Sequence, residues 1–173
     1  MGDSLVTVVA IFLAAILMFV FPLMTMADRN DDVAQLAVQT ATTEFVDDVR
    51  NTGKLTLDNY DKYIQTITST GNSFETAIEV SILDDNRGVK ATQGEINKIG
   101  ENSYFTQYTT QVEETLNKKG KMTLKEGDMV TVSVKNTNQT IAQTLRNFFY
   151  MIAGNDTYQI FAQHGGVVTV NGN

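Results

Sequence analysis

The residues that could carry acid–base or nucleophilic chemistry are few in this chain. His164 is the only histidine, it stands beside Gly165 and Gly166, and the chain has no cysteine. A catalytic histidine needs a nucleophile or a second ligand within reach, and the sequence places neither nearby. We therefore expect His164 to be a surface turn residue. The absence of cysteine excludes disulfides, thiolate metal sites and cysteine nucleophiles.

The acidic residues also form no recognisable catalytic or metal-binding motif. Asp84, Asp85 and Asn86 could offer oxygen ligands to calcium, but they lack the alternate-residue ligands and the distal glutamate of an EF-hand loop. A plain acidic turn is the favoured interpretation. Glu75 and Glu79 lie four residues apart on one predicted strand face, which is too far along a strand for a neighbouring acid and base.

The composition argues against several other functions. The sequence contains no nucleophile elbow, phosphate-binding loop or dinucleotide-binding glycine pattern, so we predict no enzyme activity, no cofactor and no metal. The net charge is −7, and the only basic cluster, at residues 118–121, is predicted to be a solvated helix end. Nucleic acid is therefore not indicated as a partner, because binding to phosphates needs clustered Lys and Arg.

The sequence feature that says most about function is a long apolar segment near the N-terminus. Leu5 to Met24 is a run of 20 residues without a charge. As a helix it would span about 30 Å, the thickness of the hydrocarbon core of a bilayer. A cleavable signal peptide is the weaker interpretation, because the chain starts Met-Gly-Asp-Ser without a basic residue and lacks a small-residue cleavage site. We expect this segment to be retained.

The helix is predicted to continue beyond the apolar run. After a polar collar at residues 28–32, apolar residues recur at helical spacing. They are Val33, Leu36, Ala37, Ala41, Phe45 and Val49. Gly53 is a plausible end signal, and Pro22 should kink the helix because it removes a backbone donor. We therefore divide the chain into an N-terminal helix at 1–53, apolar at 5–24 and amphipathic at 33–50, and a globular α+β head at 54–173.

The head is predicted to alternate short helices and strands. Helical periodicity occupies residues 56–70, 103–117 and 140–153, while alternating patterns predict strands at 73–83 and 129–136. In residues 157–170 we expect one or two strands, broken at Gly165 and Gly166. The fold class is thus α+β: a long apolar N-terminal helix leading into a small head with an antiparallel sheet and two or three short helices.

These features together resemble the type IV pilins and related pseudopilins, including Tad-type pilus subunits. The resemblance rests on residues 1–53: the apolar helix, Asp3 close to its start, Pro22 late in the run, and the amphipathic half that follows. It implies that a prepilin peptidase removes a basic leader and that apolar helices form the core of a filament. The family carries a glutamate at the fifth mature residue; here position five is Leu5, and the nearest carboxylate is Asp3.

The first functional hypothesis is a structural subunit of an extracellular, pilus-like filament at the cell surface. Its partners would be identical copies, the membrane before assembly and, by resemblance, the prepilin peptidase and the pilus assembly machinery. Small residues would let helices approach closely, and Asp3 would be tolerated in an apolar core only if paired, with the amine of a neighbouring Met1 as its partner. The residues expected to act in assembly are Met1, Asp3, Ala10, Ala14, Ala15 and Pro22.

Two alternatives remain open from the sequence. A single-pass surface protein could keep residues 5–24 in the bilayer and bind a ligand or partner through its head. A non-filamentous pseudopilin that primes a secretion or DNA-uptake machine would share the same sequence features.

Overall fold

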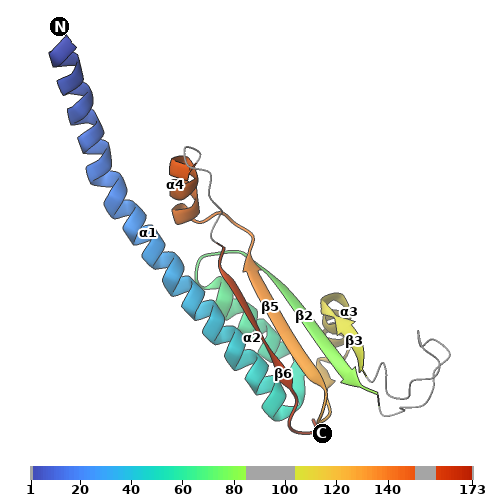
Figure 1. The fold of residues 1–173 in the computed structure, drawn as a ribbon. Helices are drawn as coiled ribbons and strands as arrows, with labels where there is room; N and C mark the ends of the chain where they lie inside the picture. The colour runs from blue at the N-terminus through green and yellow to red at the C-terminus, as the bar shows by residue number, and fades with distance from the viewer. Residues whose placement is uncertain (1, 85–103, 151–158, 173) are drawn as a thin grey trace, which may run out of the picture.

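The fold consists of one very long helix with a head packed along its C-terminal half (Figure 1). The computed structural model describes residues 2–84, 104–150 and 159–172. Helix α1 (Gly2–Thr52) continues through Pro22 without a break, and its axis changes direction between the projecting half and the half that lies along the head. The predicted long helix is therefore confirmed, and so is the α+β class of the head.

The head adds three short helices and two antiparallel sheets to α1. The larger sheet has the strand order β3-β2-β5-β6, and the smaller one pairs β1 with β4. In chain order the elements are β1 (Lys54–Thr56), α2 (Leu57–Thr68), β2 (Phe74–Leu83), β3 (Tyr104–Tyr108), α3 (Thr109–Lys119), β4 (Lys121–Thr123), β5 (Met129–Asn136), α4 (Ile141–Tyr150) and β6 (Phe161–Val167).

The sheet forms because its two central strands alternate apolar and polar residues in matching register. Ile78 of β2 lies opposite Val132 of β5, and Val80 lies opposite Val130. All four are fully buried. A one-residue slip would turn these side chains to the wrong face, so the alternation fixes the register. The predicted strands at 73–83 and 129–136 are confirmed.

The amphipathic half of α1 supplies one wall of the core. Val38, Val46 and Val49 are fully buried against the sheet and against α2. Tyr63 and Ile67 on the inner face of α2 complete this layer, as their helical spacing predicted. The same helix that projects from the molecule is therefore also a core element of the head.

The ends of the short helices follow the predicted signals. Thr56 caps α2, and its hydroxyl accepts a hydrogen bond from the backbone N–H of Asn59 at 3.2 Å. Gly53 and Gly120 adopt the left-handed conformation after α1 and α3, with φ of 64° and 71°. Lys118 and Lys119 lie in the last turn of α3, which confirms that the basic cluster ends a helix.

Two of the secondary-structure elements predicted for the head differ from the structure. Residues 104–108 form strand β3 rather than the start of a helix, because they complete a ladder with β2, in which Phe105 lies opposite Ile82. Tyr and Phe favour strands, and here tertiary pairing outweighs the helical spacing. Residues 161–167 form one continuous strand, with Gly165 and Gly166 paired to β5 rather than breaking it. The short strands β1 and β4 were not predicted.

Replacing Gly53 with alanine should destabilise the head strongly. Besides the strain of a positive φ, an added Cβ would collide with the backbone of Val170 and Gly172. We expect the free energy of unfolding to fall by about 2 kcal/mol or more in a urea titration of the protein in detergent. Gly71→Ala is the matched control, because Gly71 has φ 83° but open space around its Cβ. Equal losses in the two variants would contradict the steric argument.

Candidate functional site: the exposed apolar helix and its collar

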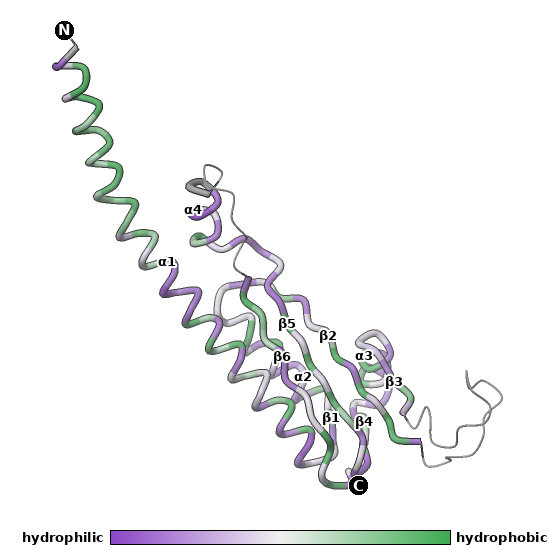
Figure 2. The backbone as a smooth tube through the Cα atoms, in the orientation of Figure 1, coloured by the Kyte–Doolittle hydropathy of each residue, from purple (hydrophilic) through white to green (hydrophobic). Residues whose placement is uncertain are grey.

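The first half of α1 projects from the head with its apolar side chains in solvent. Its most apolar window of 18 residues contains no buried residue, and α1 is long and apolar enough to cross a membrane. Figure 2 shows this half as mostly hydrophobic between its hydrophilic first turn and the collar. The large exposed side chains are Leu5, Val6, Val8, Val9, Ile11, Phe12, Leu13, Ile16, Met18, Phe19, Phe21 and Leu23.

An exposed apolar surface of this extent requires an apolar partner. Covering one Leu, Ile or Phe side chain contributes about 1.5–3 kcal/mol, and contiguous exposed patches mark protein or membrane contacts. The polar groups of the segment are largely satisfied within the helix: the Thr7 hydroxyl donates to the Asp3 carbonyl at 2.7 Å, and the Thr25 hydroxyl donates to the Phe21 carbonyl at 3.0 Å. The segment can therefore enter either lipid or an apolar protein core.

The predicted assembly residues are distributed along this projection. Asp3, Ala10, Ala14 and Ala15 are all exposed, and so is Pro22. Ala10 and Ala14 lie on one face of the helix because they are four residues apart. Met1 lies outside the described residues. Pro22 lacks an amide hydrogen, so the Met18 carbonyl loses its helical donor at this point.

The polar collar is an attachment site for α4, which the sequence analysis did not foresee. Asp31 is only 3% exposed, and its Oδ2 accepts a hydrogen bond from the Thr140 hydroxyl at 2.6 Å. Nearby, the guanidinium of Arg146 donates to Asp28 Oδ1 at 2.6 Å. The start of α4 and its second turn are thus both tied to α1.

Thr140 also caps α4. Its hydroxyl accepts a hydrogen bond from the backbone N–H of Gln143 at 3.2 Å, and the side-chain oxygen of Gln143 accepts one from the backbone N–H of Thr140 at 3.0 Å. This reciprocal pair is a capping box, for which Thr-x-x-Gln is a recognisable sequence signal. The contact with Asp31 has no such signal, because the two residues are 109 positions apart.

His164 occupies a strand rather than the predicted turn. It lies in β6, and its Nε2 is 3.2 Å from the Asp47 carboxylate on α1. Arg50 donates to the same carboxylate oxygen at 2.8 Å. The hydrogen bond with His164, followed by the contacts with Arg50, lowers the pKa of Asp47. The cluster joins α1 to β6.

Gly166 leaves room on β6 for a side chain from α1. A Cβ at that position would lie 2.6 Å from the guanidinium carbon of Arg50. The space allows Arg50 Nε to donate to the Val167 carbonyl at 3.0 Å. Of the two glycines that appeared to interrupt the strand, Gly166 therefore admits a side chain from α1, while Gly165 lies against Thr131 of β5.

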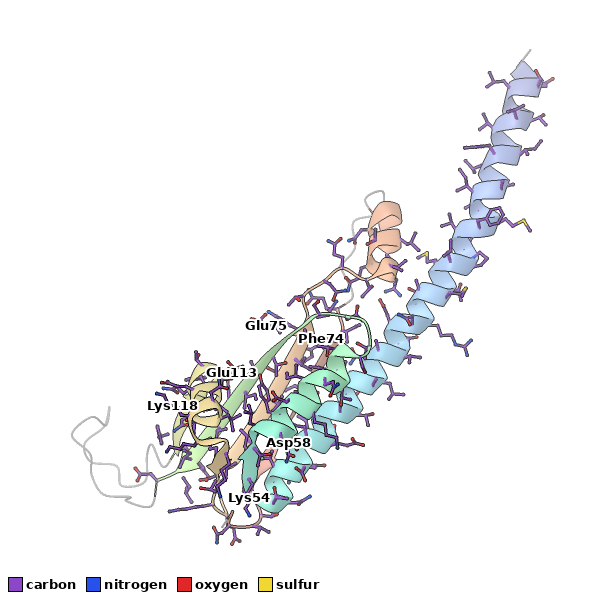
Figure 3. All side chains as sticks on the ribbon, turned by 180° about the vertical axis from the view of Figure 1, so that it is seen from behind. Lys54, Asp58, Phe74, Glu75, Glu113 and Lys118 are labelled. Carbon is purple, nitrogen blue, oxygen red and sulfur yellow. The ribbon has the colours of Figure 1, made fainter. Side chains whose placement is uncertain are left out.

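Glu75 and Glu79, the candidate pair of carboxylates, both lie on β2. Glu75, which Figure 3 labels on β2, forms an ion pair with Lys135 at 3.1 Å across the strands, while Glu79 is exposed. Asp85 and Asn86, from the considered calcium turn, lie outside the described residues. Within the part of the chain that the structure describes, no group of three His, Asp or Glu side chains could hold a metal ion.

A groove of about 420 Å³ opens where the projecting helix leaves the head. Leu23, Met26 and Asn30 of α1 line one side of it. The opposite sides come from the connection between α2 and β2, at residues 70–72, and from residues 138–141 at the start of α4. The groove is thus adjacent to both the apolar projection and the collar.

Comparisons with known proteins give no relative. No family model matches this chain, and neither a curated protein nor a solved structure matches it. The arrangement itself, a long apolar N-terminal helix leading into a head with an antiparallel sheet, is compatible with a pilin-like architecture.

Proposed function

We propose that this protein is the structural subunit of an extracellular, pilus-like filament. It is held in the membrane by its projecting helix before assembly, and it polymerises when that helix packs against the helices of identical subunits. The observation that carries the proposal is the double use of α1, whose C-terminal half is core while its N-terminal half exposes apolar side chains on every face.

The continuity of α1 favours assembly into a filament rather than the attachment of a head by a flexible tether. A single helix joins the apolar projection to the buried residues Val38, Val46 and Val49, so that the head has a defined direction relative to the projection. Heads carried in this way can repeat regularly around a core of parallel helices. A tether that only anchored a binding domain would need no such direction.

The small residues suit close packing of these helices. Ala10 and Ala14 lie on one helical face, and alanine lets neighbouring backbones approach closely in an apolar environment. Pro22 leaves a backbone carbonyl without its helical donor, which locally loosens the helix where neighbours would cross. Prepilin peptidase and the pilus assembly machinery are the partners that the resemblance implies.

Microscopy of material sheared from cells tests this proposal. We expect negative-stain images to show thin filaments that antibodies against the head decorate along their length. Cells that lack the gene for this chain are the control and should yield no decorated filaments. Recovery of the chain only with membranes would overturn the proposal and support the alternative, a single-pass surface protein with a partner-binding head.

A further inference from the structure

Helix α4 lies beside α1 at the level where the apolar segment ends. Thr140 contacts Asp31, and Arg146, further along α4, contacts Asp28. As α4 advances, its partners on α1 move toward the N-terminus, so the two helices run antiparallel. The C-terminal end of α4 therefore reaches toward the apolar projection, as Figure 2 also shows.

The surface at this level combines exposed apolar side chains with polar ones. Ile141 at the start of α4 is 69% exposed, and Met26 on α1 is 71% exposed. Both line the groove of about 420 Å³, together with the amide side chains of Asn30, Asn72 and Asn138. Apolar side chains next to amides match the region of a bilayer where acyl chains meet the glycerol and headgroup layer.

The position of the collar carboxylates gives a physical reason for the attachment of α4 to α1 at the end of the apolar run. Asp28 and Asp31 follow the apolar run within two turns of the same helix. A carboxylate so close to hydrocarbon is costly unless it is paired or hydrogen-bonded. Arg146 supplies the ion pair for Asp28, and Thr140 supplies the hydrogen bond for Asp31. Helix α4 thus compensates both groups at the boundary.

We propose that α4 and the adjoining groove form a lipid-contacting surface that seats the head on a phospholipid bilayer. Ile141 and Met26 enter the outer part of the acyl layer, and the amides of the groove meet the glycerol and headgroup layer. This inference rests on the membrane stage of the proposed function. It assigns to α4 the role of fixing how deeply α1 is inserted.

The position of the apolar run selects lipid as the occupant rather than a second copy. A segment from Leu5 to Met24 has the length of the hydrocarbon core, so its end defines where the headgroup layer begins. Met26 lies within one turn of that end, and Ile141 lines the same groove. Once the segment is inserted, lipid meets this surface without any further association.

The test uses the full chain, which has no tryptophan, so each introduced tryptophan is a unique fluorescent probe. Ile141→Trp is reconstituted into phosphatidylcholine vesicles whose acyl chains carry bromine either near the headgroup or near the bilayer centre. Bromine quenches only a probe that it can contact. We expect about a twofold loss of emission with the shallow bromines and a smaller loss with the deep ones.

Two matched variants make the result decisive. Phe12→Trp, within the apolar run and 68% exposed, should be quenched most by the deep bromines. Val170→Trp should not be quenched, because Val170 is exposed and its backbone lies against Gly53, at the end of α1 opposite the apolar run. Quenching of Phe12→Trp without quenching of Ile141→Trp would overturn the lipid-contact inference but not the membrane stage. A second copy of the chain covering Ile141 would give this same result. Absence of quenching in both would overturn the membrane stage as well.

Discussion

Replacing Asp3 with alanine is expected to abolish filaments while the protein still accumulates in the membrane. In the proposed filament the start of α1 is surrounded by the apolar helices of other subunits. A charge buried there is tolerated only when it is paired, and the free amine of a neighbouring Met1 is the proposed partner of Asp3. Removing the carboxylate leaves that ammonium unpaired, which typically costs about 3–5 kcal/mol for each broken pair.

The measurement compares sheared filaments with the amount of the chain in membranes. Asp32→Ala is the matched control, because it removes the same charge from an exposed collar position outside the apolar run. We expect this control to give normal filaments. An N-terminal peptide mass from wild-type filaments establishes whether Met1 carries a free amine. Normal filaments from Asp3→Ala would refute the pairing.

The elements that the sequence predicts well are those whose pattern is local. The apolar run and the three- and four-residue spacing after it require only a helix, and the structure contains that helix from Gly2 to Thr52. Strands β2 and β5 are equally readable, since alternate residues are buried on one face. The sequence also indicates the candidate site, because an uncharged stretch of bilayer length has few uses.

The elements that escaped prediction depend on contacts between distant residues. Residues 104–108 have helical spacing, yet they pair with β2 and become its edge partner. The two glycines of β6 suggest a break in the strand when only the sequence is considered, whereas in the structure the Arg50 side chain lies against Gly166. The attachment of α4 to the collar joins residues more than 100 positions apart, of which only the capping box at Thr140 has a local signal.

The double use of α1 makes the stability of the head a condition for assembly. If the head unfolds, the amphipathic half of α1 loses its partners and exposes a second apolar face beside the first. Such a chain would associate without order rather than in register. A buried residue that packs α1 against α2 through aromatic contacts is therefore a point where a single change should lower both stability and filament yield.

Phe45 is that residue, and we expect Phe45→Ala to lower the free energy of unfolding by about 3 kcal/mol or more. Phe45 is 6% exposed, and its ring stacks on Tyr63 with the centroids 4.6 Å apart and the planes 8° from parallel. It also lies 6.4 Å from the ring of Tyr60. Truncation removes both aromatic contacts and leaves the Tyr63 ring, whose hydroxyl is hydrogen-bonded to Thr42, unsupported on one side.

A urea titration in detergent, followed by near-ultraviolet circular dichroism of the tyrosines, measures this loss. Leu36→Ala is the matched control on the same helix, because Leu36 is 66% exposed and should change the free energy of unfolding by less than about 0.5 kcal/mol. A second groove, of about 330 Å³ between α1 and α2, is lined by Phe45 and opens to solvent. Water can enter the space that truncation leaves, so the loss of stability should fall at the lower end of the range for buried Phe→Ala. A loss no larger than that of Leu36→Ala would show that α1 and α2 are held together by other contacts.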